Sequence, residues 1–141
     1  MKLRSALAAL AFVAAPLAAH AQDKVADNDA TLYPGRVEFP LPSDTRVPSD
    51  CAYPSGLTGA TGVDLTCVVT HNEDFGQSLI SWLGTHGWRA GDNILGGFEA
   101  VRATDNGCEQ TLSIYPHEMT DGEGVWFALA QQPRCRPSTP H

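Results

Sequence analysis

Two short clusters of histidine and acidic residues bring together side chains that could hold a metal ion. They are HNED at residues 71–74 and HEMTDGE at residues 117–123. Zinc sites pair cysteines or histidines at close spacing, and calcium loops repeat aspartate or asparagine at alternate positions. Neither cluster has these spacings. We therefore expect no metal and no cofactor, and we interpret the clusters as a helix start and a solvated turn.

Residues that could act as nucleophiles lack the sequence partners that such chemistry uses. Ser78, Ser81 and Ser113 stand in neither G-x-S-x-G nor S-x-x-K. Glycoside cleavage needs two carboxylates at a set separation in space, which a sequence alone does not define. The short chain also leaves little length for building a deep cleft. We therefore expect a protein that is not an enzyme.

Four cysteines, Cys51, Cys67, Cys108 and Cys135, suggest a disulfide framework. An even number in an oxidising compartment predicts two disulfides, whereas a cysteine nucleophile would leave an odd thiol. Residues 1–21 have a basic start, an apolar run and a small-residue end, which is the pattern of a cleavable signal peptide. The apolar run is shorter than the ~20 residues of a membrane span. We expect a periplasmic or secreted bacterial protein without membrane insertion.

Removal of the signal peptide leaves a strongly acidic protein. The loss of Lys2 and Arg4 reduces nine basic residues to seven, against 16 acidic residues, so the net charge becomes −9. Such a chain repels the phosphate backbone of nucleic acids. The charge therefore argues against nucleic acid as a partner, and it favours either simple solubility or a cationic partner.

The elements that would position a site begin after a polar segment. Residues 22–50 contain four prolines and are expected to form an N-terminal arm or strap. Residues 51–136 are expected to form one disulfide-stapled domain, followed by a tail at 137–141. Alternation predicts a first strand over Val63–Thr70, whose buried side carries Val63, Leu65, Cys67 and Val69.

A helix is predicted over about Asp74–His86. Its apolar residues fall at helical spacing on one face: Phe75, Leu79, Trp82, Leu83 and His86. Gly87 suits the left-handed position after the helix, where Leu83 and Trp88 would meet. Gly76 and Gly84 each cost about 1 kcal/mol relative to alanine. They suggest either a helix side that lies close to the sheet or simple tolerance on an exposed side.

The remaining chain predicts three strands, at residues 98–104, 108–116 and 124–132, with GDNILGG (residues 91–97) as a loop. Asn106-Gly107 predicts a tight type I′ hairpin between the first two. The resulting order is β-α-β-β-β. We expect an α+β domain in which one helix lies across a mostly antiparallel sheet.

Matching apolar residues of the last two strands pairs Ile114 with Phe127 and Tyr115 with Trp126. A slip of two residues would instead place Cys108 opposite Cys135, and only an odd slip would exchange the faces. We therefore favour the disulfides Cys108–Cys135 and Cys51–Cys67. The face with Ile114 and Phe127 should receive the helix.

The opposite face is the candidate binding surface. Its members are Tyr115, Trp126, Thr111 and Ser113, together with Arg102 from the neighbouring strand. Aromatic side chains beside small residues could receive a sugar ring or an extended peptide. The alternative, which we favour, is that Leu32, Tyr33, Phe39 and Leu41 of the strap cover this face as a second small core.

Three functions are compatible with these features. The first is a non-catalytic binding module that inhibits or neutralises a basic protein partner, in the manner of an inhibitor or immunity protein. The second is a glycan- or peptide-binding domain that uses the Tyr115/Trp126 face. The third and least favoured is a small hydrolase.

Overall fold

A computed structural model describes residues 24–25, 29–49, 51–119 and 122–137. The predicted signal peptide and the final tail residues lie outside the described residues. A seven-stranded antiparallel sheet forms the body, in the order β1-β4-β5-β9-β8-β7-β6. Its strands are β1 (Lys24–Val25), β4 (Arg46–Val47), β5 (Val63–Thr70), β6 (Trp88–Ile94), β7 (Gly97–Ala103), β8 (Glu109–Met119) and β9 (Gly122–Ala130).

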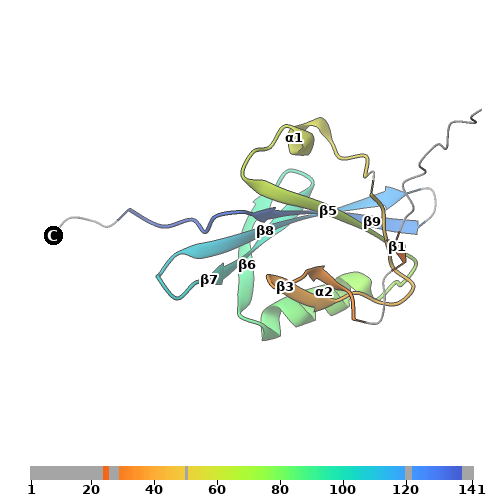
Figure 1. The fold of residues 1–141 in the computed structure, drawn as a ribbon, viewed down its shortest axis with the longest axis horizontal. Helices are drawn as coiled ribbons and strands as arrows, with labels where there is room; N and C mark the ends of the chain where they lie inside the picture. The colour runs from red at the N-terminus through yellow and green to blue at the C-terminus, as the bar shows by residue number, and fades with distance from the viewer. Residues whose placement is uncertain (1–23, 26–28, 50, 120–121, 138–141) are drawn as a thin grey trace, which may run out of the picture.

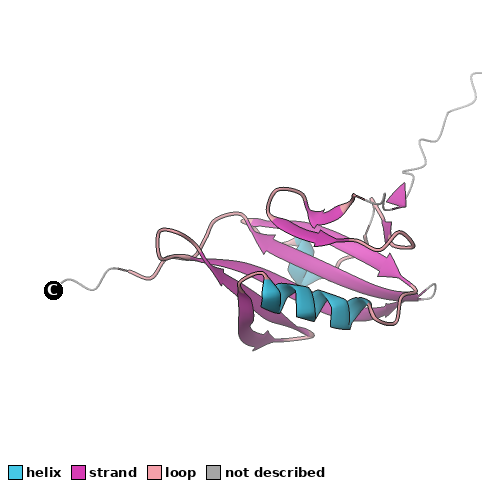
Figure 2. Cartoon of the chain, turned by 90° about the horizontal axis from the view of Figure 1, so that it is seen from below, coloured by secondary structure: helices cyan, strands magenta, loops and turns pink. Residues whose placement is uncertain are grey.

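Three smaller elements cover the sheet. Helix α2 (Phe75–Thr85) and the hairpin β2 (Thr31–Tyr33)–β3 (Val37–Pro40) lie on one side, and the short helix α1 (Ser55–Thr58) lies on the other (Figure 1). Seen from below, α2 runs across the front of the sheet and α1 lies behind it (Figure 2). We call the side with Val68, Leu112 and Phe127 the α2 face, and the side with Cys67, Ser113 and Trp126 the α1 face.

The predicted helix is confirmed to within one residue at each end. The side-chain oxygen of Asn72 accepts a hydrogen bond from the Asp74 N–H (2.9 Å) just before the helix starts. Gly87 has φ +81°, which is the left-handed conformation expected after a helix end. Leu83 and Trp88 are both buried in the core cluster. No helix among the described residues has the length and apolar character needed to cross a membrane.

The N-terminal strap covers the face opposite to the one we expected. Leu32, Tyr33, Phe39 and Leu41 belong to the core cluster that contains Phe75 of α2 and Phe127 of β9. The phenol oxygen of Tyr33 lies 2.8 Å from the carbonyl oxygen of Asp64. The ring of Phe39 packs edge-on against Phe75, with centroids 5.6 Å apart. The prediction failed because the strap's apolar residues complete the main core beside α2 and leave the Tyr115/Trp126 face to another segment.

Strand β5 has the predicted bounds, but its second half, residues 67–70, is buried on both sides. Val68 packs in the core of the α2 face, while Cys67 and Val69 are buried on the α1 face. Alternation of polar and apolar residues pointed to one buried side. Thr66 in fact lies opposite Phe127 on the core side. The strand is therefore a central strand covered by two different elements.

Three local predictions need correction. The segment 91–97, expected to be a loop, forms most of strand β6 and its turn into β7, so the predicted order β-α-β-β-β lacks β6 as well as the short strands β1 to β4 of the N-terminal segment. The helix α1 was not predicted at all.

Asn106-Gly107 does join two strands, but only Gly107 has positive φ (+77°), so the turn is not type I′. Instead, the Gly107 N–H donates a hydrogen bond to the backbone carbonyl oxygen of Thr104, and Gly107 itself is the left-handed residue that ends the turn.

Glycine is required at position 97 because two strands approach closely there. A Cβ on Gly97 would lie 2.1 Å from the carbonyl oxygen of Ile114 on β8. This approach aligns β7 with the part of β8 that leads to Tyr115.

Both predicted disulfides, Cys51–Cys67 and Cys108–Cys135, are confirmed, and they are consistent with an extracellular or periplasmic location. The β8–β9 pairing also has the predicted register, with Ile114 opposite Phe127 and Tyr115 opposite Trp126. Beyond β9 the register differs by two residues, because Glu109 bridges Arg134. Both registers considered from the sequence therefore occur, one on each side of the turn at residues 131–133.

Candidate functional site

The predicted aromatic surface is assembled in part. Tyr115 and Trp126 are direct neighbours across β8 and β9, and Thr111 and Ser113 share their face by alternation along β8. Arg102 does not join them. It pairs with Trp88 and Gln110 on the α2 face, and its guanidinium lies 4.7 Å from the Trp88 ring centroid. The expectation that Arg102 contributes to this surface was wrong because β7 places even-numbered residues on the α2 side.

Trp126 lies half-buried on the α1 face. The ring of His117 stacks on it, with centroids 3.6 Å apart and planes 12° from parallel. Burial lowers the pKa of His117, so the imidazole that stacks on Trp126 is neutral near pH 7. On β5, Cys67 lies opposite Trp126 and carries the disulfide to Cys51. The segment that begins at Cys51 and includes α1 thus covers the part of this face that we had assigned to the strap.

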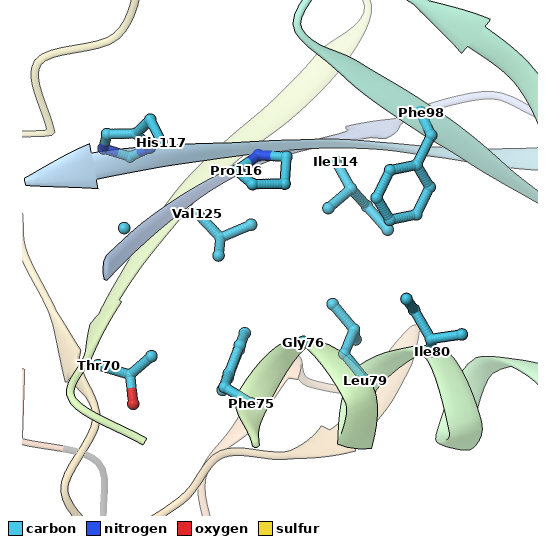
Figure 3. Close-up of a pocket in the computed structure, with 11 residues that line it drawn as sticks. Thr70, Phe75, Gly76, Leu79, Ile80, Phe98, Ile114, Pro116, His117 and Val125 are labelled. Carbon is cyan, nitrogen blue, oxygen red and sulfur yellow. The ribbon is translucent and has the colours of Figure 1, made fainter. Parts of the chain in front are cut away.

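A second surface, which sequence reasoning missed, is a hollow between α2 and the sheet. It has a volume of about 310 Å³ and its sides are drawn in Figure 3. Phe75, Leu79 and Ile80 project from the helix toward Ile114, Val125 and Phe98 of the sheet. The ring of His117 lies on the far side of β8, so that residue borders the hollow without its imidazole entering it (Figure 3).

The hollow continues along the helix into a second one of about 390 Å³. Ile80 and Phe98 border both, and the second is completed by Leu83, Gly84, Trp88, Ala90, Asn93 and Ala100, with Arg89 and Glu99 at its margin. We call the two hollows together the α2 groove. Ile80 is 53% exposed between them. Arg89 and Glu99 pair with Val101 and Ser113 of the α1 face, so their side chains belong to the other side of the sheet.

Two glycines explain why the groove is open. Gly76 lines the first hollow and Gly84 the second, one turn before and one turn after Ile80. A Cβ at either glycine would meet nothing within 4 Å. The suggestion that these glycines let the helix approach the sheet was therefore wrong. They instead remove side chains that would occupy the space on each side of Ile80.

The groove offers apolar contact and few hydrogen bonds. Of the described side chains that project into it, Thr70 and Asn93 are polar and Trp88 carries an indole N–H without a hydrogen-bond partner; the Thr70 hydroxyl already accepts the Asn72 N–H (3.0 Å). Volumes of 300–1,000 Å³ with mostly apolar walls are typical of ligand pockets. Such walls suit apolar side chains or hydrocarbon, whose burial stabilises a complex by about 25 cal/mol per Å².

Carboxylates are concentrated at one end of the groove. Glu73 and Asp74 directly precede the helix residues that line the first hollow, and neither has an ion pair within the described residues. No lysine or arginine is among the described residues that line this hollow. The end is therefore acidic.

The HNED cluster does not form a metal centre within the described part of the chain, and the HEMTDGE cluster includes Asp121, which lies outside the described residues. No group of three or more histidine, cysteine, aspartate or glutamate residues in the described part could hold a metal ion. His71, Glu73 and Asp74 lie at the start of α2, as expected for the HNED segment. Comparisons with protein-family models, curated proteins and solved structures found no match to this chain. The assignment of a function therefore rests on the geometry of these surfaces.

Proposed function

We propose that this protein is a non-catalytic binding module of the periplasm or the extracellular space that captures a basic protein partner through the α2 groove. The observation that supports the proposal is the pairing of an open apolar groove with an acidic end. A partner segment that carries an apolar anchor beside lysine or arginine would match both features.

Charge complementarity distinguishes this occupant from a free fatty acid. The carboxylate of a fatty acid would be repelled by Glu73 and Asp74 at the end of the groove and by the net charge of −9 that remains without residues 1–21. A cationic segment gains from the same field, which also speeds encounter at low salt. The groove thus favours a basic protein segment, in keeping with an inhibitor- or immunity-type role.

A defined peptide tests the proposal. A fluorescently labelled peptide of alternating lysine and leucine should bind with an affinity that falls steeply as salt is added. Gly76→Phe and Gly84→Phe fill the two hollows and should each reduce the affinity at least about tenfold, a loss of about 1.4 kcal/mol. Because neither glycine has a neighbour within 4 Å of an added Cβ, both variants should remain folded by circular dichroism.

Ser78→Phe is the matched control. Ser78 is exposed on α2 outside the groove, so an aromatic ring added there should leave the affinity unchanged. Equal binding by all three variants, or equal binding of a glutamate–leucine peptide, would contradict the proposal.

A second candidate function uses the half-buried Trp126 on the α1 face. The His117 ring already stacks on one side of the indole, which shows that a planar group fits there. A glycan or an extended peptide could replace that contact. Trp126→Ala should then abolish a ligand-dependent fluorescence change without unfolding the protein. Unchanged fluorescence of the wild type across a panel of oligosaccharides and peptides would remove this candidate.

A further inference from the structure

The chain that follows β9 turns back and lies beside the start of β8. The backbone N–H of Arg134 donates a hydrogen bond to the backbone carbonyl oxygen of Glu109 (2.7 Å). In return, the backbone N–H of Glu109 donates to the backbone carbonyl oxygen of Arg134 (2.8 Å). The disulfide Cys108–Cys135 fixes the next residue. Because side chains alternate along extended chain, Arg134 and Arg136 both project away from the disulfide, toward the α1 face.

A polar pocket of about 300 Å³ lies under these arginines, on the other side of the sheet from the α2 groove. We call it the arginine pocket. Its floor is formed by Val101 and Thr111, which are paired across β7 and β8 and are buried. Its walls are Arg89, Gly91, Asp92, Glu99, Glu109, Arg134 and Arg136.

The arginine pocket contains several cationic side chains, although the protein as a whole is acidic. Beyond residue 21 the chain has seven lysine and arginine residues, and three of them line this pocket. Arg89 forms an ion pair with Glu109. Arg134 and Arg136 form no ion pair with any other described residue. Two guanidinium groups therefore line the pocket without a carboxylate partner among the described residues.

Two carboxylates in the same walls are equally unpaired. Asp92 on β6 and Glu99 on β7 have no ion pair within the part of the chain that the structure describes. A lone anion would meet these carboxylates as well as the arginines, and a lone cation would meet the arginines as well as the carboxylates. A ligand that carries both charges satisfies both sets.

Gly91 keeps the pocket accessible. Its φ lies outside the left-handed region, so the backbone there does not require glycine. A Cβ on Gly91 would, however, lie 3.1 Å from the Cβ of Glu99 and 3.3 Å from Cγ1 of Val101. A side chain at this position would press on one wall and on the floor of the pocket.

We propose that the arginine pocket binds a compact zwitterion with a carboxylate and an ammonium group, such as a free amino acid. Arg134 and Arg136 bind the carboxylate, for which the planar guanidinium offers paired N–H donors. Asp92 and Glu99 bind the ammonium group. Val101 and the methyl group of Thr111 contact the aliphatic part. The site is independent of the α2 groove and of the proposed protein partner.

Three related probes test the charges separately. L-leucine, N-acetyl-leucine and leucinamide have the same side chain, but the second lacks the ammonium group and the third lacks the carboxylate. In a titration followed by protein NMR, leucine should shift the amide signals of Val101, Thr111 and Gly91. Each blocked analogue should bind at least about tenfold more weakly. Binding of N-acetyl-leucine as tight as that of leucine, or no shift at millimolar leucine, would overturn the proposal.

Variants locate the effect. The double variant Arg134→Gln/Arg136→Gln and the double variant Asp92→Asn/Glu99→Gln should each abolish the leucine shifts, and Gly91→Ala should weaken binding. Asp44→Asn, an exposed residue outside the pocket, is the matched control and should bind leucine normally. Because the two double variants change side chains in the pocket walls and leave the core intact, their thermal midpoints should stay close to that of the wild type. Unaltered leucine shifts in both double variants would place the ligand elsewhere and contradict the inference.

Discussion

On the α2 face of the sheet, Phe127 and Leu112 are fully enclosed, whereas on the α1 face Trp126 and Tyr115 of the same two strands are only half-buried. The α2 face is covered by a three-turn helix and by the N-terminal hairpin, which together supply most of the core. The α1 face is covered by a short segment held by one disulfide. Adjacent residues of one strand therefore lie in different surroundings: Phe127 of β9 is enclosed in the core, and Trp126 beside it remains partly exposed.

The largest effect should come from two neighbours on β9. Phe127→Ala removes a ring that is 0% exposed in the core and should reduce the free energy of unfolding by about 3–5 kcal/mol. Trp126→Ala, on the half-buried side, should cost about 1–2 kcal/mol because less area is removed from contact. Urea unfolding of both variants measures the difference. Equal losses would break the distinction between the two faces.

Removal of a disulfide should have the next largest effect. Replacing Cys51 and Cys67 with serine frees a loop of 16-residue separation and should cost about 3 kcal/mol. Since Cys67 lies opposite Trp126, the tryptophan emission should also change in the folded protein. An emission spectrum identical to that of the wild type would show that the α1 segment does not shield this face.

A stabilising substitution probes the α2 face. Gly84→Ala should raise the free energy of unfolding by about 1 kcal/mol, because alanine favours the helix and its methyl group meets no atom within 4 Å. A fall in thermal midpoint would mean that the glycine is needed for packing, and would contradict our account of the open groove.

The smallest effect is a pH dependence that separates the two regions. His117 of the α1 face has a pKa below its usual value because of burial, so the unfolded state takes up its proton first as pH falls. Its contribution to stability is complete above about pH 6.5 and is lost below that value. Replacing His117 with phenylalanine should remove this part of the pH profile of the thermal midpoint.

Asp64 should act at lower pH. Hydrogen bonds from Gln131 and Arg36 lower the pKa of its carboxyl group. Its contribution is therefore present above about pH 3.9 and is lost as pH falls further. Asp64→Asn should flatten the profile in that acidic range and leave the range near pH 6 unchanged. If Asp64→Asn instead changed the profile near pH 6 and left the acidic range unchanged, the assignments of Asp64 and His117 would be wrong.

Local sequence signals predicted those parts of the fold that local physics decides. The bounds of β5 and α2, the β8–β9 register and both disulfides follow from alternation, helical spacing and matched apolar residues. β6 escaped prediction because GDNILGG is rich in turn residues, and its strand conformation depends on pairing with β7. The side covered by the N-terminal strap could not be inferred, because it depends on contacts such as Tyr33 with Asp64 that span 31 residues.

The candidate binding surfaces also combine features that local sequence signals predict with features that depend on distant contacts. The pairing of Tyr115 with Trp126 followed from register, but the position of Arg102 depended on the register of β7 against β8. The α2 groove left one visible signal, the two glycines of the helix, whose meaning depends on whether the space beside them is filled. The arginine pocket left none, because residues 89–99 reach β8 through the β6–β7–β8 pairing, whereas residues 134–136 reach it through the disulfide and the bridge between Glu109 and Arg134.

The pairing of β5 with β9 also sets an order of events during folding. The order β5-β9-β8-β7-β6 inserts the last strand between the first long strand and the meander that precedes it. A chain that becomes available from its N-terminus onward can form α2 and the β6–β8 meander early, yet β5 has no long partner until β9 arrives. Closure of the sheet therefore waits for nearly the whole polypeptide, and until then the exposed edges of β5 and β8 are the segments that a chaperone would have to protect.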